Sequence, residues 1–279
     1  MIARRIPTIL PAMSAEEAIE TTKIFSVAGR LKSDGLMMER PFRSPHHTVS
    51  NAALIGGGGM PRPGEVSLAN HGVLFLDEFT EFKRSAIEVL RQPLEDRTVT
   101  IARAHATATF PASFMLVAAM NPCPCGNLTD PRKACRCGAR DIDRYRRKIS
   151  EPILDRIDIH IEVPPAEYKD ISGTESSEAS EAMRARVTAC RRIQEERFSE
   201  CPSTFTNAQM PAKVITGHCG LDGEGKALLR SACARLGLSA RSYSKILKIA
   251  RTIADLDATE RIKPRHLAEA IQYRSHDFG

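Results

Sequence analysis

The segment Asn70–Phe82, NHGVLFLDEFTEF, passes from five residues of buried-strand character, GVLFL, directly to two adjacent carboxylates, Asp77 and Glu78. Apolar residues without alternation indicate a strand buried on both faces, as in a parallel sheet. A carboxylate at the tip of such a strand can bind Mg²⁺, and its neighbour can orient or deprotonate an attacking water. On this pattern alone, two solvated loop carboxylates after a core strand are an equally good interpretation.

A site that hydrolyses a nucleotide also needs a loop that holds the phosphates, and the sequence lacks the motif of such a loop. No G-x-x-x-x-G-K-[ST] occurs in the 279 residues. The stretch GGGGMPRPG has too many prolines and no Lys, and GLDGEGKAL lacks both a preceding strand and a Ser or Thr after Lys226. The two carboxylates therefore stand in this sequence without a phosphate loop.

The segments after the carboxylates predict a sheet around this strand. Residues 84–96 have apolar side chains at helical spacing, and residues 97–111 alternate as a β-hairpin does. Residues 113–121, SFMLVAAMN, predict a second buried strand that ends on Asn121, and residues 158–164, DIHIEVP, predict a third strand. This order is typical of an α/β domain with a largely parallel sheet, in which polar residues at strand ends bind ligands.

The segments before the opening strand predict one helix and then loops. Residues 14–30 predict a helix, because Ser14 is a favourable N-cap and Gly29 suits the end. Residues 40–72 are rich in Gly, Pro and Ser, and they predict long loops around the short apolar segment 52–55.

The last third of the chain is helical in pattern. A polar linker at residues 170–181 precedes a charged helix at residues 181–198. Three more helices are predicted, at residues 225–236, 240–256 and 264–273. The expected division is an α/β core at residues 1–168, a linker with a connecting helix at 169–210, and a helical lid domain at 211–279.

The composition indicates the cellular compartment of the protein more clearly than its function. The chain has 40 Lys and Arg against 34 Asp and Glu, a net charge of +6, which permits contact with polyanions but decides nothing. No apolar run approaches the roughly 20 residues of a membrane helix. The start, MIARRIPTILPAMSA, imitates a signal peptide, but its short apolar part carries Pro7 and Pro11, so we reject that interpretation. We expect a cytoplasmic protein with reduced thiols and no membrane partner.

Four of the eight cysteines, Cys123, Cys125, Cys135 and Cys137, form two C-x-C pairs with nine residues between them. Four thiolates that converge on one Zn²⁺ would make a closed structural site and would hold a loop that has little core of its own. Zinc knuckles more often use C-x-x-C, so reduced thiols without a ligand are an equal alternative.

Five segments together carry a resemblance to a known family: RPFRSPHHTVSNAALIGGGG, GVLFLDEF, MLVAAMNPCPCG, ILDRIDIHIEV and LSARSYSKILKIARTIADL. In this order and spacing they closely resemble the magnesium-chelatase-like AAA+ family, over nearly all 279 residues. The clustered cysteines favour its competence-type branch. The resemblance implies a partial AAA+ P-loop-type α/β core with a mostly parallel sheet, plus a C-terminal α-helical lid. It also implies that the chain is the C-terminal part of a larger protein and begins just past the phosphate loop.

The resemblance implies roles for named residues. Asp77 matches the Walker B residue that binds Mg²⁺, and Glu78 matches its water-activating partner. Asn121 matches the sensor that orients the water near the γ-phosphate of ATP. Arg156 matches an arginine finger that acts in a neighbouring subunit's site, and Arg241 matches the sensor-2 arginine on the ATP phosphates.

Each of the last three residues also has an ordinary interpretation. Asn121 precedes a proline and can be a turn residue. Arg156 can pair with Asp155 or Asp158 at the surface, and Arg241 can be a solvated arginine at a helix start. The matched context favours the functional roles. A finger that acts in trans requires a head-to-tail interface, and the resemblance implies a homo-hexameric ring.

Two segments are candidates for contact with DNA. Arg103 and His105 lie near the turn of the predicted hairpin, where the family inserts a hairpin into a central pore, and their side chains could touch phosphates. Arg103 can equally be an ordinary solvated charge. Residues 132–148 carry eight basic residues against two acidic ones, although such runs are usually solvated faces.

The sequence therefore predicts part of an ATP- and Mg-dependent AAA+ ATPase that acts on DNA, with helicase or branch-migration work in recombination and natural transformation. The isolated 279-residue chain is expected to be inactive. Two alternatives stay open: a chelatase-type motor subunit that drives metal insertion, and a non-enzymatic, zinc-stabilised nucleic-acid-binding module.

Overall fold

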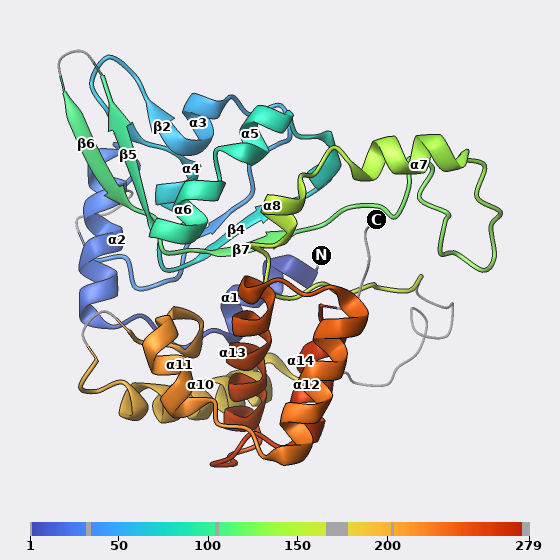
Figure 1. The fold of residues 1–279 in the computed structure, drawn as a ribbon. Coiled ribbons are helices and arrows are strands. Elements are labelled where there is room, and N and C mark those ends of the chain that lie inside the picture. Colours follow the sequence, from blue (N-terminus) through green and yellow to red (C-terminus); the bar gives the residue numbers. More distant parts are fainter. Residues whose placement is uncertain (1, 32–34, 104–105, 166–177, 202–203, 275–279) are drawn as a thin grey trace.

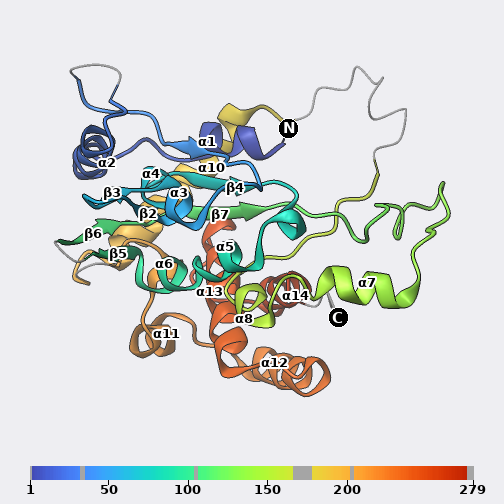
Figure 2. The ribbon, with the colours of Figure 1, turned by 90° about the horizontal axis from the view of Figure 1, so that it is seen from above.

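The computed structural model describes residues 2–31, 35–103, 106–165, 178–201 and 204–274 (Figure 1). A mixed α/β part contains a small parallel sheet, and a group of helices from the last third of the chain lies on one side of it (Figures 1 and 2). Each part has its own cluster of buried apolar side chains. This architecture confirms the predicted fold class, whereas the domain boundaries at residues 168 and 210 stay predictions.

The parallel sheet has the order β1-β4-β7. Its strands are β1 (Phe42–Arg43), β4 (Val73–Leu76) and β7 (Met115–Ala118). Both pairings are parallel, and they align Leu74 of the middle strand with Arg43 and with Leu116. Within β4, Leu74 and Leu76 are fully buried. The apolar run before the two carboxylates is therefore the central strand of the described sheet, as predicted.

The other two predicted strands differ from expectation. Residues 113–121 contain β7, but it is an edge strand of the described sheet, and Met115 is 42% exposed, so full burial was wrong. Residues 158–164 form no strand, and Ile161 in this segment is 64% exposed. Its alternating pattern suits a strand, but the backbone N–H of His160 donates to the carbonyl of Tyr273 at the end of a helix, 2.9 Å away.

Short helices surround the sheet. They are η1 (Ile2–Arg5), α1 (Ile6–Ile9), α2 (Ala15–Val27), α3 (Asn51–Ile55), α4 (Glu65–Leu68), η2 (Phe79–Glu81), α5 (Arg84–Glu88), α6 (Arg91–Asp96), α7 (Ala139–Arg146) and α8 (Glu151–Leu154). Helix α2 begins as predicted, because the Ser14 side chain accepts from the backbone of Glu17 while the Glu17 carboxylate accepts from the backbone of Ser14. Residues 84–96 form two helices instead of one. Pro93 has no N–H to donate to Val89, and the break lies before it.

The predicted hairpin is present. Strands β5 (Thr98–Ala102) and β6 (Thr107–Pro111) pair antiparallel. The expected long loops at residues 40–72 were wrong in part, because they contain α3, α4 and a second hairpin of β2 (Gly56–Gly57) and β3 (Arg62–Pro63). Gly56 is required here: its φ is +119°, and a Cβ would lie 2.4 Å from the carbonyl oxygen of Arg62.

The C-terminal part is built from helices close to the predicted ones. They are α10 (Ser180–Arg197), η3 (Asn207–Gln209), α11 (Ala212–His218), α12 (Gly223–Leu236), α13 (Ala240–Leu256) and α14 (Pro264–Gln272). Their buried face includes Leu229, Ile246 and Leu267. Helix α10 packs against both α1 and α13 and so connects the two parts. Among the described helices, none combines the length and the apolar content that a membrane crossing requires.

A buried ionic network lies inside this helical part. The carboxylate of Asp255 is 1% exposed and accepts from both Nη atoms of Arg197, at 2.6 and 2.5 Å. It also accepts from Nε of Arg251 at 3.1 Å and from Nδ2 of Asn207 at 2.7 Å. The hydrogen bonds that Arg197 donates to Asp255 raise the pKa of Arg197. One carboxylate therefore pairs with two guanidinium groups, those of the partly buried Arg197 and the buried Arg251.

Candidate active site

The two carboxylates lie at the carboxyl end of the central strand. Both Asp77 and Glu78 are exposed, and the backbone N–H of Glu78 donates to Oδ1 of Asp77 at 3.0 Å. Glu78 has φ 52° and ψ 47°, a left-handed conformation that is uncommon for a residue with a side chain. The next residue, Phe79, is buried, and its N–H donates to the carbonyl of Ala119 after β7, 2.8 Å away. The buried side chain of Phe79 and the hydrogen bond of its N–H to Ala119 hold the backbone of Glu78 in this strained conformation.

A histidine that sequence reasoning did not assign to the site contacts Glu78. Nδ1 of His47 lies 2.9 Å from Oε2 of Glu78. The His47 ring packs on the ring of His46, with centroids 4.0 Å apart, and its edge contacts Phe82. His46 bonds within its own loop, with Nδ1 3.0 Å from Oγ1 of Thr48, whereas His47 faces Glu78. The loop after β1 lies beside the end of β4 because these strands are parallel neighbours.

Asn121 lies on the same edge of the sheet. It follows the end of β7 by three residues and is exposed. The register aligns Ala118 with Leu76, so strands β4 and β7 end at the same level of the sheet. Within the described residues, Asn121 makes no hydrogen bond to Asp77 or Glu78.

The two predicted arginines come together on one carboxylate. Nη2 of Arg156 lies 2.5 Å from Oε2 of Glu95, and Nη2 of Arg241 lies 2.9 Å from Oε1 of the same side chain. The hydrogen bond from Arg156 is the main reason that the pKa of Glu95 is lowered. The sequence offered no signal for Glu95, because it comes from α6 and meets α13 only in the tertiary structure.

Polar contacts with the helical part hold the segment that carries Arg156. The carboxylate of Asp155 accepts from Oγ of Ser242 at 3.0 Å and from Nη2 of Arg274 at 3.1 Å. Arg274 also donates to the carbonyl oxygen of Ile157, at 2.5 Å. The alternative partners proposed for Arg156, Asp155 and Asp158, are thus not the ones observed: Asp155 bonds to the helical part, and Arg156 bonds to Glu95.

The four cysteines of the C-x-C pairs form one cluster. All four Sγ atoms lie within 4.8 Å of one another. Cys123, Cys125 and Cys135 form a triangle of sulfurs with sides of 3.5, 3.7 and 3.7 Å. Sulfurs at the corners of a ZnS₄ tetrahedron, each about 2.3 Å from the metal, are about 3.8 Å apart. The spacing therefore suits a tetrahedral metal ion.

The thiols of this cluster differ in acidity. Backbone N–H groups of Arg136 and Asn127 donate to the sulfur of Cys125 and lower its pKa to about 6. Cys137 also receives a backbone hydrogen bond, from Cys125, but desolvation and the neighbouring sulfurs outweigh it and raise the pKa of Cys137 to about 12. The thiolate of Cys125 forms easily, while the raised pKa values of Cys135 and Cys137 oppose their ionisation, and a bound divalent cation would relieve this.

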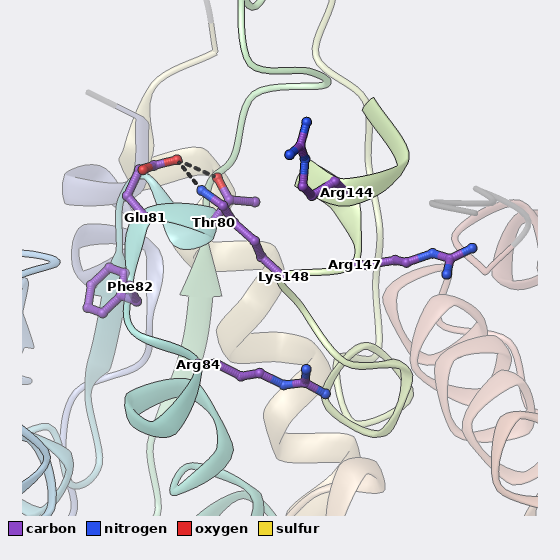
Figure 3. Close-up of a pocket in the computed structure, with 7 residues that line it drawn as sticks. All are labelled: Thr80, Glu81, Phe82, Arg84, Arg144, Arg147 and Lys148. Atoms are coloured by element: carbon purple, nitrogen blue, oxygen red, sulfur yellow. Dashed lines mark hydrogen bonds and ion pairs between the residues drawn. The ribbon is translucent and has the colours of Figure 1, made fainter. Parts of the chain in front are cut away.

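A pocket lined by basic side chains lies between η2 and α7 (Figure 3). The hydroxyl of Thr80 donates to the buried Tyr145 hydroxyl at 2.6 Å and joins the two walls. The Nζ of Lys148 lies 3.2 Å from Glu81, and Arg147 pairs with Asp143 at 2.8 Å. The lining residues are Thr80, Glu81, Phe82, Arg84, Arg144, Arg147 and Lys148. Exposed ion pairs such as that of Arg147 are weak, so an anionic group can compete for these cations.

The hairpin candidates are only partly described. The backbone of Arg103 closes the hairpin through its bond to Ala106, 2.9 Å long. A Cβ placed on Gly57 would lie 3.2 Å from Nη2 of Arg103, so this side chain lies over the β2 hairpin. His105 lies outside the described residues.

Comparison with known proteins gives two adjacent family matches. The family described as "Magnesium chelatase, subunit ChlI" matches residues 1–171, and "Magnesium chelatase, subunit ChlI C-terminal" matches residues 177–274. Similar proteins include "Competence protein ComM" of Haemophilus influenzae, which is 44% identical over 276 residues, covering 99% of this chain and 53% of that protein. "Uncharacterized protein YifB" of Escherichia coli is 41% identical over 278 residues, covering 99% and 54%. The chain spans about half the length of these relatives.

Proposed function

Because the chain belongs to the magnesium chelatase, subunit ChlI, family, we propose that it is part of an ATP-hydrolysing AAA+ motor that acts on DNA. The observation that carries the proposal is the position of Asp77 and Glu78. They follow the central strand of the parallel sheet, with Glu78 in a strained conformation held from both sides. Strain of this kind concentrates at functional sites, and carboxyl ends of parallel strands are where such sheets bind ligands.

In the proposed site, each residue has a separate task. Asp77 holds Mg²⁺, since a carboxylate oxygen is the ligand that this ion prefers. Glu78 orients the attacking water and accepts a proton from it. The neutral amide of Asn121 orients the same water without adding charge. Bound Mg–ATP supplies the phosphoryl group and the countercharge for its transfer. The phosphate-loop motif is absent from the 279 residues, so phosphate binding is a property to be tested in the whole protein.

In this proposal, Arg156 and Arg241 stabilise the negative charge of the ATP phosphates. In the structure, both arginines pair with Glu95. In a ring of identical subunits, Arg156 exchanges Glu95 for the phosphates of a neighbouring subunit's ATP, and Arg241 exchanges it for the phosphates of the ATP in its own subunit. Glu95 is 49% exposed, so water can hydrate its carboxylate after the exchange. A head-to-tail contact of this kind closes into a ring, and we propose a homo-hexamer.

The DNA part of the proposal rests on the basic pocket. Its cations, Arg84, Arg144, Arg147 and Lys148, lie on or beside α5 and α7. When Lys and Arg side chains bind DNA phosphates, counterions are released from the DNA. This release favours binding whatever the DNA sequence is. The specific work proposed is helicase action or branch migration during recombination of incoming DNA.

The deciding experiment measures ATP hydrolysis by the whole protein with and without single-stranded and branched DNA. We expect DNA to stimulate turnover several-fold, with a strong salt dependence. ATPase activity that is indifferent to DNA would contradict the DNA role and favour a chelatase-type motor. DNA binding without any ATP hydrolysis would favour the non-enzymatic module.

Variants of the pocket residues test, in the same assay, whether the pocket binds DNA. Replacement of Arg144 and Arg147 by Ala should raise the DNA concentration that half-stimulates turnover, while turnover without DNA is unchanged. The matched control replaces Arg230 and Arg235 by Ala, which removes the same charge from the exposed face of α12. An equal effect of both double variants would show that net charge matters and the pocket does not.

We also propose that the cysteine cluster holds zinc, and we expect about one zinc ion per chain after purification without chelators. Cys125→Ser should lower that content, while Cys201→Ser, outside the cluster, should not. Removal of the metal should speed trypsin cleavage at Arg132, Lys133 and Arg136, because the cluster holds this loop. Elemental analysis and timed proteolysis give the two readouts. Protein free of zinc that resists trypsin equally well would refute the proposal.

A further inference from the structure

Glu95 on α6 is bound by two arginines that come from different parts of the chain. Nη2 of Arg156 donates to Oε2 of Glu95 at 2.5 Å. Nη2 of Arg241, in the first turn of α13, donates to Oε1 at 2.9 Å. Within the described residues, these two side chains are the only ones that pair with Glu95, and each of its oxygens accepts from one arginine.

The side chain of Arg156 is folded back onto its own chain. Its Nη1 donates to the carbonyl oxygen of Pro152, one helical turn earlier, at 2.7 Å. The side chain is only 13% exposed, and its guanidinium group faces the protein that carries it. To contact a phosphate in a neighbouring subunit, this group must leave both Glu95 and Pro152.

The contacts with Glu95 use only part of the hydrogen-bonding capacity of the two guanidinium groups. Nε of Arg156 is buried without a hydrogen-bond partner among the described residues, and each arginine donates to Glu95 through one nitrogen. A phosphate can accept two parallel hydrogen bonds from one guanidinium group. The side chains of Glu95 and Arg241 are 49% and 44% exposed, and ion pairs open to water are weak. Phosphates of a bound nucleotide can therefore displace the carboxylate.

Glu95 nevertheless opposes nucleotide binding, because it is always present on the same chain. A tethered group competes at a high effective concentration. The form that binds nucleotide, with the arginines free, is then only a fraction of the protein, and the apparent affinity falls by that fraction. The hydrogen bond from Arg156 lowers the pKa of Glu95, so the carboxylate keeps its charge at neutral pH.

We infer that Glu95 forms an autoinhibitory contact: it holds Arg156 and Arg241 against their own chain and competes for them with the phosphates of ATP. This inference rests on the proposed function, in which both arginines contact those phosphates. Removal of the charge of Glu95 should therefore strengthen nucleotide binding. A purely structural bridge between α6 and α13 would have the opposite effect, because its loss would weaken binding.

Glu95→Gln in the whole protein tests the inference, because Gln keeps the size of Glu and lacks its charge. We expect the Kd for a fluorescent ATP analogue with Mg²⁺ to fall about threefold to tenfold. Asp96→Asn is the matched control: Asp96 is exposed on the same helix and pairs with neither arginine in the described residues. Its loss should change Kd by less than about twofold. An equal fall in both variants, or an unchanged or higher Kd in Glu95→Gln, would overturn the inference.

A second comparison distinguishes this inference from the function on which it rests. In a variant with both Arg156→Ala and Arg241→Ala, the added Glu95→Gln should change Kd by less than about twofold, because the groups that Glu95 holds are missing. The same fall in Kd with and without the arginines would refute competition for them. The double arginine variant by itself tests the proposed function: an unchanged Kd would refute the contact of these arginines with phosphates, whatever Glu95 does.

Discussion

Replacement of Glu78 by Gln in the whole protein should lower ATP turnover by about two to four orders of magnitude, the usual contribution of a positioned general base. Gln has the size and hydrogen-bonding capacity of Glu but cannot accept the proton of the attacking water. The carboxylate lies at the end of β4, exposed to solvent, with Nδ1 of His47 2.9 Å from its Oε2. In the proposed site, Asp77 and not Glu78 binds Mg²⁺, so nucleotide affinity should stay within a few-fold of that of the unaltered protein.

Two measurements check this expectation. A coupled phosphate-release assay gives turnover, and a fluorescent nucleotide gives affinity. Glu88→Gln is the matched control, because it removes a carboxylate from the neighbouring helix α5, where Glu88 pairs with Arg91. Turnover in Glu78→Gln close to that of the control would show that another group activates the water. Loss of nucleotide binding together with turnover would show that Glu78 has a structural role.

Replacement of Asp255 by Ala should destabilise the helical part by about 3–5 kcal/mol, the cost of breaking a buried ion pair by removing one partner. Asp255 is 1% exposed and forms ion pairs with both Arg197 and Arg251, whose side chains are 13% and 3% exposed. Without the carboxylate, the guanidinium groups of Arg197 and Arg251 both lose their ion-pair partner. The amide of Asn207 loses one of its two acceptors as well and keeps Oγ1 of Thr252.

Urea unfolding of the 279-residue chain, followed by circular dichroism, tests this expectation. The transition of the helical part should move to much lower urea, or be lost. Glu260→Ala is the control, because its exposed carboxylate lies just beyond α13, and its effect should stay within about 0.5 kcal/mol. A shift for Asp255→Ala no larger than that of Glu260→Ala would mean that water reaches the network and pays much of the desolvation cost.

Local features of the chain were predictable because short segments encode them. The unbroken apolar run of β4 predicted the central strand and placed Asp77 and Glu78 at its end. Ser14 predicted the start of α2, and its side chain accepts from the backbone of Glu17 there. Hydrophobic periodicity and capping are properties of neighbours in sequence, so they can be read without knowledge of the fold.

Predictions were incomplete or wrong for segments whose structure depends on residues far away in the sequence. Residues 158–164 have a strand pattern, but their backbone bonds to the end of α14. The helix expected over residues 84–96 is two helices. A pattern states which face of a segment is apolar, and it does not state which segment will cover that face.

The sequence by itself determined the strand that carries the carboxylates, the spacing of the four cysteines and the family to which the chain belongs. Only the tertiary structure decided that His47 meets Glu78 and that Arg156 and Arg241 share Glu95. The physical reason is that these contacts join residues 31, 61 and 146 positions apart. No local periodicity specifies such pairs, and packing of the whole chain brings them together.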